Sequence, residues 1–589
     1  QEYPFALKAV GDKAFTEGIN RMVVHRYAMQ PHSNAVPAMT LGPWGIHFDR
    51  TNTWWEPARA WMDYLNRCQT LLQEGLFVAD LAYFTGDNVV GYTKVHRNEL
   101  NPVPPEGYDY DLMNTETLLN RAWIEQGRLR LPDGMSYRIL VLQEQSYITL
   151  GLLRKLREMV EQGLVIVGAR PHQTVGLQSY SITEEKEFEQ LCDELWGKNM
   201  ATMIDRNIGK GRVFWEISLN LNQVFRQIQL KPDFEVGDNP NSAPIRYIHR
   251  QIGDTDVYFV TNQRRTPEDI ICNFRVEGKV PEFWNPLTGE RSRALVYQKN
   301  EGMTSVPIQL DEYGSVFVVF RSDLPEQTAI RSIYKDSECL VDASVVSVEE
   351  QEQAKYFGVK DDFSISLWVK PESDAMLNTD NPMGYISYPW TEYYAIYPSH
   401  GELLYGTGHA TCGMAIGRNG VAVWENAKGY PEFKMAVEKP ISGWSHICLV
   451  YKEGAPHIYI NGEYVTYKTR SLQTIHPGLN PTTLKEGASY YNGDMSVPVL
   501  FQRVLSNKEI SRLAAEGYVK KADERALNWV PYADNRFLLA WHDGNYDFIT
   551  SDGVKKKIKV EKVGTPVMLN QKWEITFPDG CGAPEKITL

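Results

Sequence analysis

Several side chains capable of acid–base chemistry lie in one short stretch of the sequence, residues 41–56, which reads LGPWGIHFDRTNTWWE. The stretch holds two carboxylates, two basic groups and three indole rings: Asp49, Glu56, His47, Arg50, Trp44, Trp54 and Trp55. Carboxylates act as acid, base or nucleophile on a glycosidic bond. Indole rings pack on the apolar faces of sugars, and His47 and Arg50 are suited to hold hydroxyl groups. We therefore predict a polar site here, with Glu56 and Asp49 as candidate catalytic groups.

Each of these residues also has a structural interpretation. Glu56 lies where a carboxylate stabilises the positive end of a helix. Asp49 and Arg50 are adjacent and suit a structural ion pair, and Trp54 and Trp55 suit a hydrophobic core. For single residues both interpretations stay open. For the whole loop we favour the site, because loops so rich in Trp, His and charge rarely serve connection alone.

The segments on either side of the loop predict how it is held. Residues 21–27 (RMVVHRY) have the length and β-branched content of a buried parallel strand. His25 and Tyr27 end this strand and would join the site as substrate contacts. A helix is predicted over 57–75, with Pro in its first turn, Gly75 at its end and an apolar stripe of Trp61, Leu65, Cys68 and Leu72. Strand, loop and helix form one βα unit.

The rest of the chain predicts a multidomain fold of α/β and β units, as expected for 589 residues. Residues 76–226 alternate strands and helices, which indicates a parallel, doubly wound sheet. Residues 227–325 change to a period of two, typical of a small antiparallel sandwich. Residues 326–520 are again β-rich, with Asn461-Gly462 as a type I′ hairpin turn. Residues 521–589 read as the start of one more β module.

Composition excludes several classes of protein. The net charge of −13 argues against a nucleic-acid partner, because phosphate binding needs clustered Lys and Arg. No apolar run approaches the roughly 20 residues that span a bilayer. The seven Cys include no CxxC pair, which gives no indication of a zinc or thioredoxin-like site. Residues 1–10 do not form a signal peptide, so we expect either a cytoplasmic chain or a missing start.

Three segments carry a specific resemblance: GINRMVVHRYAMQP, MTLGPWGIHFDRTNTWWE and AWMDYLNRCQTLLQEGLFVADLAYFTGD. Together they resemble glycoside hydrolase family 106, the α-L-rhamnosidases, nearly without interruption over residues 11–87. The later segments GYDYDLMN and GLVIVGARP fit as well. The resemblance implies an inverting hydrolase with a (β/α)8 barrel and two catalytic glutamates, and it leaves open a calcium ion at the substrate.

The resemblance also assigns the first domain. It places residues 21–27 on the last barrel strand, so that 1–75 would be the C-terminal end of the barrel. The earlier strands, which carry both family glutamates, would then lie before Gln1, and this chain is predicted to lack the catalytic pair. Glu56 and Asp49 are the loop carboxylates that remain.

The later domains resemble accessory modules. Residues 76–226 are similar to the amidotransferase-like domain of several glycosidases, but Gln143 to Gln145 replace the Cys that such an enzyme needs. Residues 326–520 resemble a laminin-G/concanavalin-like jelly roll, in which Trp390, Tyr393, Tyr394 and Trp424 form either a sugar platform or core. The end of the chain resembles a truncated galactose-binding-like sandwich.

Three functions remain in competition. The first is part of an α-L-rhamnosidase acting on a rhamnose-containing polysaccharide. The second is a non-catalytic carbohydrate-binding or scaffold fragment, and the third is a β-galactosidase-like hydrolase with the same layout. Carbohydrate is the expected partner, and no cofactor is required by the sequence, with calcium possible. Enzymes of this architecture usually act outside the cytoplasm, so we expect a periplasmic or extracellular protein. The oligomeric state is left open.

Overall fold

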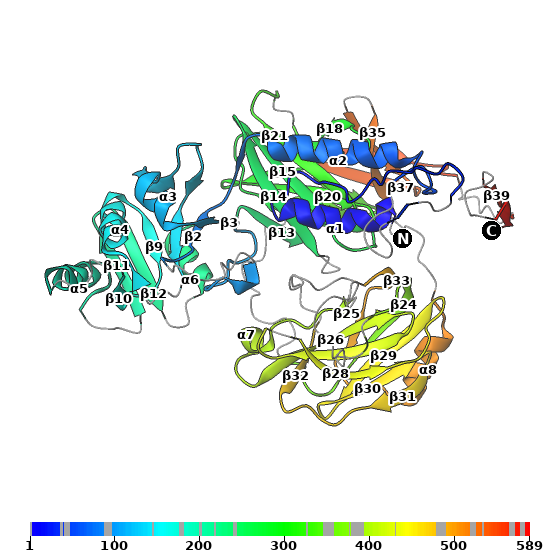
Figure 1. The fold of residues 1–589 in the computed structure, drawn as a ribbon. Helices are drawn as coiled ribbons and strands as arrows, with labels where there is room; N and C mark the ends of the chain where they lie inside the picture. Colours follow the sequence, from blue (N-terminus) through cyan, green and yellow to red (C-terminus); the bar gives the residue numbers. More distant parts are fainter. Residues whose placement is uncertain are drawn as a thin grey trace.

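The computed structural model in Figure 1 shows an α/β unit, a central β-sandwich flanked by two helices, and a separate jelly roll. The structure describes residues 3–35, 39–40, 48–87, 97–143, 147–175, 182–198, 203–216, 220–238, 244–325, 328–344, 358–375, 377, 394–429, 431–478, 491–518, 526–532, 535–564, 572–577 and 584–588.

The α/β unit is built on a six-stranded sheet in the order β11-β12-β9-β7-β2-β3. Every neighbouring pair is parallel except β11 and β12 at one edge. Helices pack on both faces, α4 and α5 on one and α6 on the other, so the strands read as continuous apolar runs. The bounds are β2 Leu81–Phe84, β3 Tyr110–Met113, β7 Ile139–Leu142, β9 Val165–Val167, β11 Met203–Ile208, β12 Gly211–Glu216, α3 Thr115–Asn120, α4 Leu150–Gln162, α5 Ile182–Trp196 and α6 Leu221–Gln227.

The central sandwich has two antiparallel sheets, in the orders β1-β14-β15-β21-β17-β18 and β13-β16-β20-β19. One face of the first sheet packs on the second sheet, and its other face packs on helices α1 and α2. Residues 76–84 therefore supply strands to two units, β1 to the sandwich and β2 to the α/β unit. The bounds are α1 Pro4–Thr16, α2 Ala58–Gln73, β1 Leu76–Phe77, β13 Phe234–Asp238, β14 Ile245–Ile252, β15 Thr255–Asn262, β16 Glu268–Phe274, β17 Val280–Trp284, β18 Arg291–Arg293, β19 Gln298–Asn300, β20 Met303–Leu310 and β21 Ser315–Arg321.

The jelly roll consists of two sheets packed around one core, and it is inserted into a smaller sheet. That smaller sheet has the order β23-β22-β37-β38, so residues 330–342, predicted with the jelly roll, pair instead with 544–560. Its bounds are β22 Ile330–Lys335, β23 Glu338–Asp342, β37 Gly544–Thr550 and β38 Lys555–Val560. Those of the jelly roll are β24 Phe363–Pro371, β25 Tyr394–Ile396, β26 His409–Gly417, β27 Gly420–Asn426, β28 Glu432–Val437, β29 Ser445–Lys452, β30 Ala455–Ile460, β31 Glu463–Tyr467, β32 Thr474–Pro477, β33 Gly493–Met495, β34 Val499–Phe501, α7 Gly401–Tyr405 and α8 Asn507–Ala515.

Residues 21–27 do not form the predicted strand. They have no regular secondary structure, and the side chains of Val23 and Tyr27 are 88% and 62% exposed. A β-branched run becomes a strand only beside another strand that accepts its backbone hydrogen bonds, and no described strand pairs with it. The helix predicted over 57–75 is confirmed as α2, with Gly75 at φ +64°, where a Cβ would lie 2.1 Å from the carbonyl oxygen of Gln251.

Asp12 of α1 holds both helices on the sandwich. Its carboxylate is fully buried and accepts hydrogen bonds from Lys8, 2.6 Å away, from the Tyr64 hydroxyl of α2, and from Thr261 of β15. The Lys8 ammonium group also donates hydrogen bonds to the carbonyl oxygen of Tyr313 and to the hydroxyl of Ser315, each at 2.7 Å. A buried carboxylate is stable only when such partners replace water.

We expect Asp12→Ala to lower the free energy of unfolding by about 3–5 kcal/mol, because it leaves the Lys8 ammonium group buried without its anion. Chemical denaturation of the full chain measures the change. The matched control is Asp63→Ala, which removes an exposed i,i+4 pair with Arg59 and should cost at most about 0.5 kcal/mol. Equal losses for the two variants would contradict the role of Asp12.

A second buried network joins the α/β unit to the sandwich. His249 of β14 lies between two carboxylates, with its Nδ1 2.9 Å from Asp233 and its Nε2 3.1 Å from Asp256. Arg275, directly after β16, bridges Asp233 and Asp80, which precedes β2 of the α/β unit. Burial alone would lower the pKa of His249, but the two carboxylates outweigh it and raise the pKa to about 9.

This network predicts a loss of stability at alkaline pH. The folded-state pKa of His249 is above its ordinary value of 6.5, so the charged imidazole stabilises the fold fully below pH 6.5 and loses this effect as the pH rises through 9. The loss corresponds to about 3 kcal/mol. Thermal unfolding between pH 6 and 9.5 measures it. His249→Gln should unfold earlier at pH 6 and lack this slope, and an unchanged slope would show that another group is responsible.

Candidate functional site

The described part of the predicted site lies in the long connection from α1 to α2 (Figure 1). The structure brings together Tyr27, Asp49, Trp54 and Trp55 through ring contacts and the turns that lead into α2. Trp44 and His47 lie outside the described residues, so their predicted contacts remain predictions.

Asp49 is the buried acceptor of this connection. The residue is only 2% exposed. One of its carboxylate oxygens accepts hydrogen bonds from the Thr51 backbone amide, at 2.7 Å, and from the Thr51 hydroxyl, at 2.5 Å. The other oxygen accepts from the side-chain amide of Gln30 at 3.0 Å. Gln30 in turn forms two hydrogen bonds with the backbone of Met39. Asp49 therefore links two separate turns of the loop.

Four aromatic rings form a continuous cluster beside Asp49. The ring of Phe48 lies 5.9 Å from that of Trp54 and 5.0 Å from that of Trp55, and Trp55 lies 5.9 Å from Tyr27. Tyr27 is exposed and both indoles are half-buried, so the cluster has a solvent-facing side. Phe48 was not among the predicted contacts, although its place directly before Asp49 in an aromatic-rich loop was a usable indication.

The three remaining predicted residues, His25, Arg50 and Glu56, are exposed. None of their side chains forms a hydrogen bond or an ion pair with the described residues, so Asp49 and Arg50 are not an ion pair. Glu56 immediately precedes Pro57, the N-cap residue of α2, as expected for a carboxylate near the positive end of a helix. No described residue occupies its oxygens with a hydrogen bond or an ion pair.

Other expected features can be located as well. Cys192 of the α/β unit is fully buried in the sheet–helix core, where burial raises the pKa of its thiol to about 12, so it is not a reactive thiolate. Of Gln143 to Gln145, which stand where the Cys of an amidotransferase is expected, Gln143 donates a hydrogen bond to the carbonyl oxygen of Phe84, and the other two lie outside the described residues. Tyr394 and Trp424 are 3% and 5% exposed and belong to a core cluster rather than a platform, and Trp390 and Tyr393 are not described.

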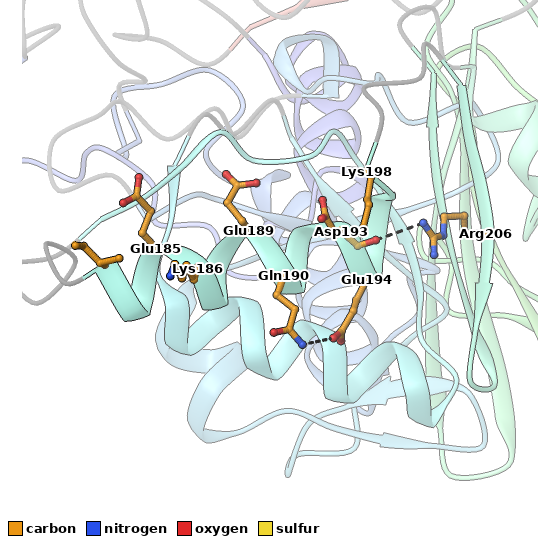
Figure 2. A pocket seen from close by; sticks show the side chains of 9 residues that line it. Glu185, Lys186, Glu189, Gln190, Asp193, Glu194, Lys198 and Arg206 are labelled. Atoms are coloured by element: carbon orange, nitrogen blue, oxygen red, sulfur yellow. Dashed lines mark hydrogen bonds between the residues drawn. The ribbon is translucent and has the colours of Figure 1, made fainter.

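Across the described ranges, no group of three or more His, Cys, Asp or Glu side chains is arranged to hold a metal ion, and no helix is long and apolar enough to cross a membrane. A hollow of about 730 Å³ lies along α5. Its lining side chains are drawn in Figure 2, and α5 lies far from the described residues of the connection between α1 and α2, here called the 25–56 loop (Figure 1). The lining of the hollow is almost wholly charged or amide side chains, such as Glu185, Lys186 and Gln190. It lacks the aromatic rings that would stack on a sugar.

Comparison with known proteins identifies the class as glycoside hydrolase. A family model described as alpha-L-rhamnosidase matches residues 1–299, which is half of the chain, and a second model, of the concanavalin A-like lectin/glucanases superfamily, matches residues 346–511. The chain thus belongs to glycoside hydrolase family 106, the alpha-L-rhamnosidases.

Individual proteins resemble the chain at 33% sequence identity or less, and each comparison spans only part of both chains. A protein of Formosa agariphila named "Putative beta-glucuronidase" is 33% identical over 332 residues, which are 56% of this chain. The chain spans only 27% of the length of that relative. The rhamnosidase of Novosphingobium sp. PP1Y is 29% identical, with a TM-score of 0.49 over 64% of this chain and 33% of its own. A beta-galactosidase from Bacillus circulans sp. alkalophilus is 10% identical, with a TM-score of 0.30 over 45% of each chain.

The hydrogen bonds of Asp49 predict a specific effect of substitution. Asp49→Ala removes the acceptor for three donors and should loosen the loop, at a cost of about 1–3 kcal/mol in local stability. Hydrogen exchange of residues 30–35 and 48–55 measures this, with the exchange of α4 as an internal control. Asp49→Asn keeps an acceptor for Thr51 and should loosen the loop less. Equal protection in Asp49→Ala and the unmodified chain would contradict the positioning role.

Proposed function

We propose that this chain is part of an inverting α-L-rhamnosidase that acts on a rhamnose-containing polysaccharide outside the cytoplasm. The observation that carries the proposal is the aromatic cluster of Tyr27, Phe48, Trp54 and Trp55, which lies within the segment matched by the alpha-L-rhamnosidase family model. Exposed aromatic edges beside free polar groups are suited to a pyranose ring, which has an apolar face and a hydroxylated rim.

The proposed roles differ from residue to residue. Asp49 is a positioning residue, because its carboxylate oxygens are already used by Thr51 and Gln30. His25, Arg50 and Glu56 have free polar groups and would contact the hydroxyl groups of the sugar. Inversion requires two carboxyl groups about 6.5–9.5 Å apart, with a water between them. Glu56 is the one free carboxylate of the described loop, so we propose that it contacts the sugar and that the catalytic pair is not Asp49 with Glu56.

The finer fold assignments belong to the same proposal. We assign residues 1–75 to the end of a (β/α)8 barrel, 76–226 to an amidotransferase-like domain, and 326–520 to a laminin-G/concanavalin-like domain. Family membership supports the first, the parallel sheet with helices on both faces supports the second, and the superfamily match to 346–511 supports the third. A calcium ion at the substrate remains part of the proposal, without assigned ligands.

Hydrolysis of three aryl glycosides separates the competing functions. Release of nitrophenol is measured for an α-L-rhamnoside, a β-D-glucuronide and a β-D-galactoside, with and without calcium, and the anomer released first is read by NMR. We expect the chain to bind the rhamnoside in preference to the other two glycosides, and any turnover to proceed with inversion. Preference for the galactoside or the glucuronide would replace the sugar assignment. Absence of turnover together with saturable binding of the rhamnoside would favour the non-catalytic carbohydrate-binding fragment.

The aromatic cluster predicts the effect of a single substitution. Trp55→Ala should weaken binding or turnover of the rhamnoside at least tenfold, because Trp55 contacts both Phe48 and Tyr27 and its loss opens the cluster. The matched control is Trp541→Ala, since Trp541 is 51% exposed and lies near the other end of the chain. Equal effects of the two substitutions would show that the cluster is not the sugar contact.

A further inference from the structure

The outer face of the jelly roll carries a second set of aromatic rings, on the hairpin of β30 and β31. His457 pairs across the strands with Tyr467, and Tyr459 pairs with Tyr464. Cross-strand partners lie on the same face of a sheet, and His457 and Tyr459 are two positions apart, so all four rings share one face. The opposite face of the hairpin, with Ile458 and Ile460, belongs to the core.

A β-bulge produces this arrangement. Tyr464 and Tyr467 are three positions apart and would point to opposite faces of a regular strand. The register shifts between Ile458 and Tyr459, which leaves Val465 outside the ladder and packed against the core. Both tyrosines therefore face outward, 47% and 59% exposed. β31 is the edge strand of its sheet, and bulges that re-aim side chains are common at sheet edges and beside active sites.

Helix α8 packs on the same face of the sheet as the rings and covers Tyr459. Tyr459 is 7% exposed, and its hydroxyl donates a hydrogen bond of 2.8 Å to Asn507 at the start of α8. The turn of the hairpin is Asn461-Gly462, both at positive φ, and the carbonyl oxygen of Gly462 accepts a hydrogen bond from Ser511 of α8. The hairpin is thus held against a helix and offers its rings without large loss of conformational freedom on binding.

The exposed rings form a ladder with unused polar groups. The His457 and Tyr467 rings stack at 5.3 Å, those of His457 and Tyr464 lie 6.2 Å apart, and those of Tyr464 and Tyr459 lie 5.4 Å apart. Among the described residues, nothing hydrogen-bonds the hydroxyls of Tyr464 and Tyr467 or the ring nitrogens of His457. Burial and the nearby Lys452 lower the pKa of His457, so the ladder is uncharged at neutral pH.

We propose that His457, Tyr464 and Tyr467 form a binding site for an uncharged pyranose unit of a polysaccharide, separate from the 25–56 loop. The phenol rings of Tyr464 and Tyr467 carry no charge at neutral pH, which matches a neutral sugar. Ring faces cover the C–H face of the sugar, and the phenol and imidazole groups supply donors and acceptors for its hydroxyls. The inference rests on the proposed function for its class of ligand. Such a site would hold the polymer on the chain while the loop contacts another sugar unit.

Affinity electrophoresis of the full chain tests this site, in gels that contain neutral rhamnan, neutral arabinogalactan or acidic rhamnogalacturonan. We expect a neutral polysaccharide to retard the unmodified chain. Tyr464→Ala and Tyr467→Ala should each weaken retardation at least fivefold in apparent affinity, and Tyr464→Phe and Tyr467→Phe should stay within about threefold. The control is Tyr147→Ala, which removes a tyrosine of similar exposure, 43%, from the α/β unit and should have no effect. Thermal unfolding checks that each variant is folded.

Several outcomes would overturn the proposal. These are the absence of retardation in both neutral gels, retardation confined to the acidic gel and abolished by salt, or equal losses in Tyr147→Ala. Sedimentation that shows a dimer broken by Tyr467→Ala would assign the ladder to contact between copies of the chain instead. Hydrolysis or binding of the aryl rhamnoside by the same variants should be unchanged. If the unmodified chain neither hydrolyses nor binds the aryl rhamnoside but still binds polysaccharide, only the proposed function is contradicted.

Discussion

The position of the candidate loop depends on the burial of one carboxylate, Asp12. No strand pairing anchors the segment from α1 to α2, because the connection between the two helices contains no strand in its described parts. What fixes the two helices is the face of the first sandwich sheet beneath them, where Asp12 of α1 meets Lys8, Tyr64 of α2 and Thr261 of β15. Apolar packing is not directional, whereas this network fixes the register of each helix on the sheet. The ends of the loop are thereby held at set points.

The same sandwich sheet also serves the other units. Its second face packs on the other sheet of the sandwich. Strand β1, which pairs with β14, leads directly into the α/β unit. Asp233 forms ion pairs with both His249 and Arg275, and Arg275 also forms one with Asp80. Such networks hold units together only while every member keeps its partner. The jelly roll contacts this body through Arg265, whose guanidinium group lies 2.7 Å from Glu372. Helices α1 and α2, the α/β unit and the jelly roll are therefore all attached to the sandwich.

Local patterns were sufficient for the elements whose surroundings follow from the pattern itself. The alternation of strands and helices over 76–226 predicted a parallel, doubly wound sheet, and β7 and β9 are its central parallel strands, buried on both faces. The stripe from Trp61 to Leu72 predicted α2, and Asn461-Gly462 predicted the hairpin that β30 and β31 form. The prediction of a strand over residues 21–27 was wrong, because a strand forms only beside a neighbouring strand, and the local sequence pattern does not reveal that neighbour. The pairing of β22 with β37 was missed for the same reason.

For the site, residue types indicated the place and misjudged some of the parts. The density of Trp, His and charge correctly drew attention to the loop, and Tyr27, Trp54 and Trp55 do meet in one cluster. Whether a carboxylate is free or already hydrogen-bonded depends on turn geometry, and in that respect Asp49 and Glu56 differ although their type is similar. The tyrosines of β31 escaped attention because a bulge, and not alternation, brings them to one face.

The insertion of the jelly roll has a consequence for the synthesis of the chain. Ile333 of β22 pairs with Phe548 of β37, 215 residues later, so the first half of that sheet leaves the ribosome long before its partner exists. At about 5–20 residues per second, the wait is roughly 10 to 40 s. During that time the backbone groups of β22 meant for β37 have no strand to pair with, while the jelly roll folds from residues that follow them. The inserted jelly roll can therefore be complete before the sheet of β22 and β37, which lies on either side of it in the sequence, is formed.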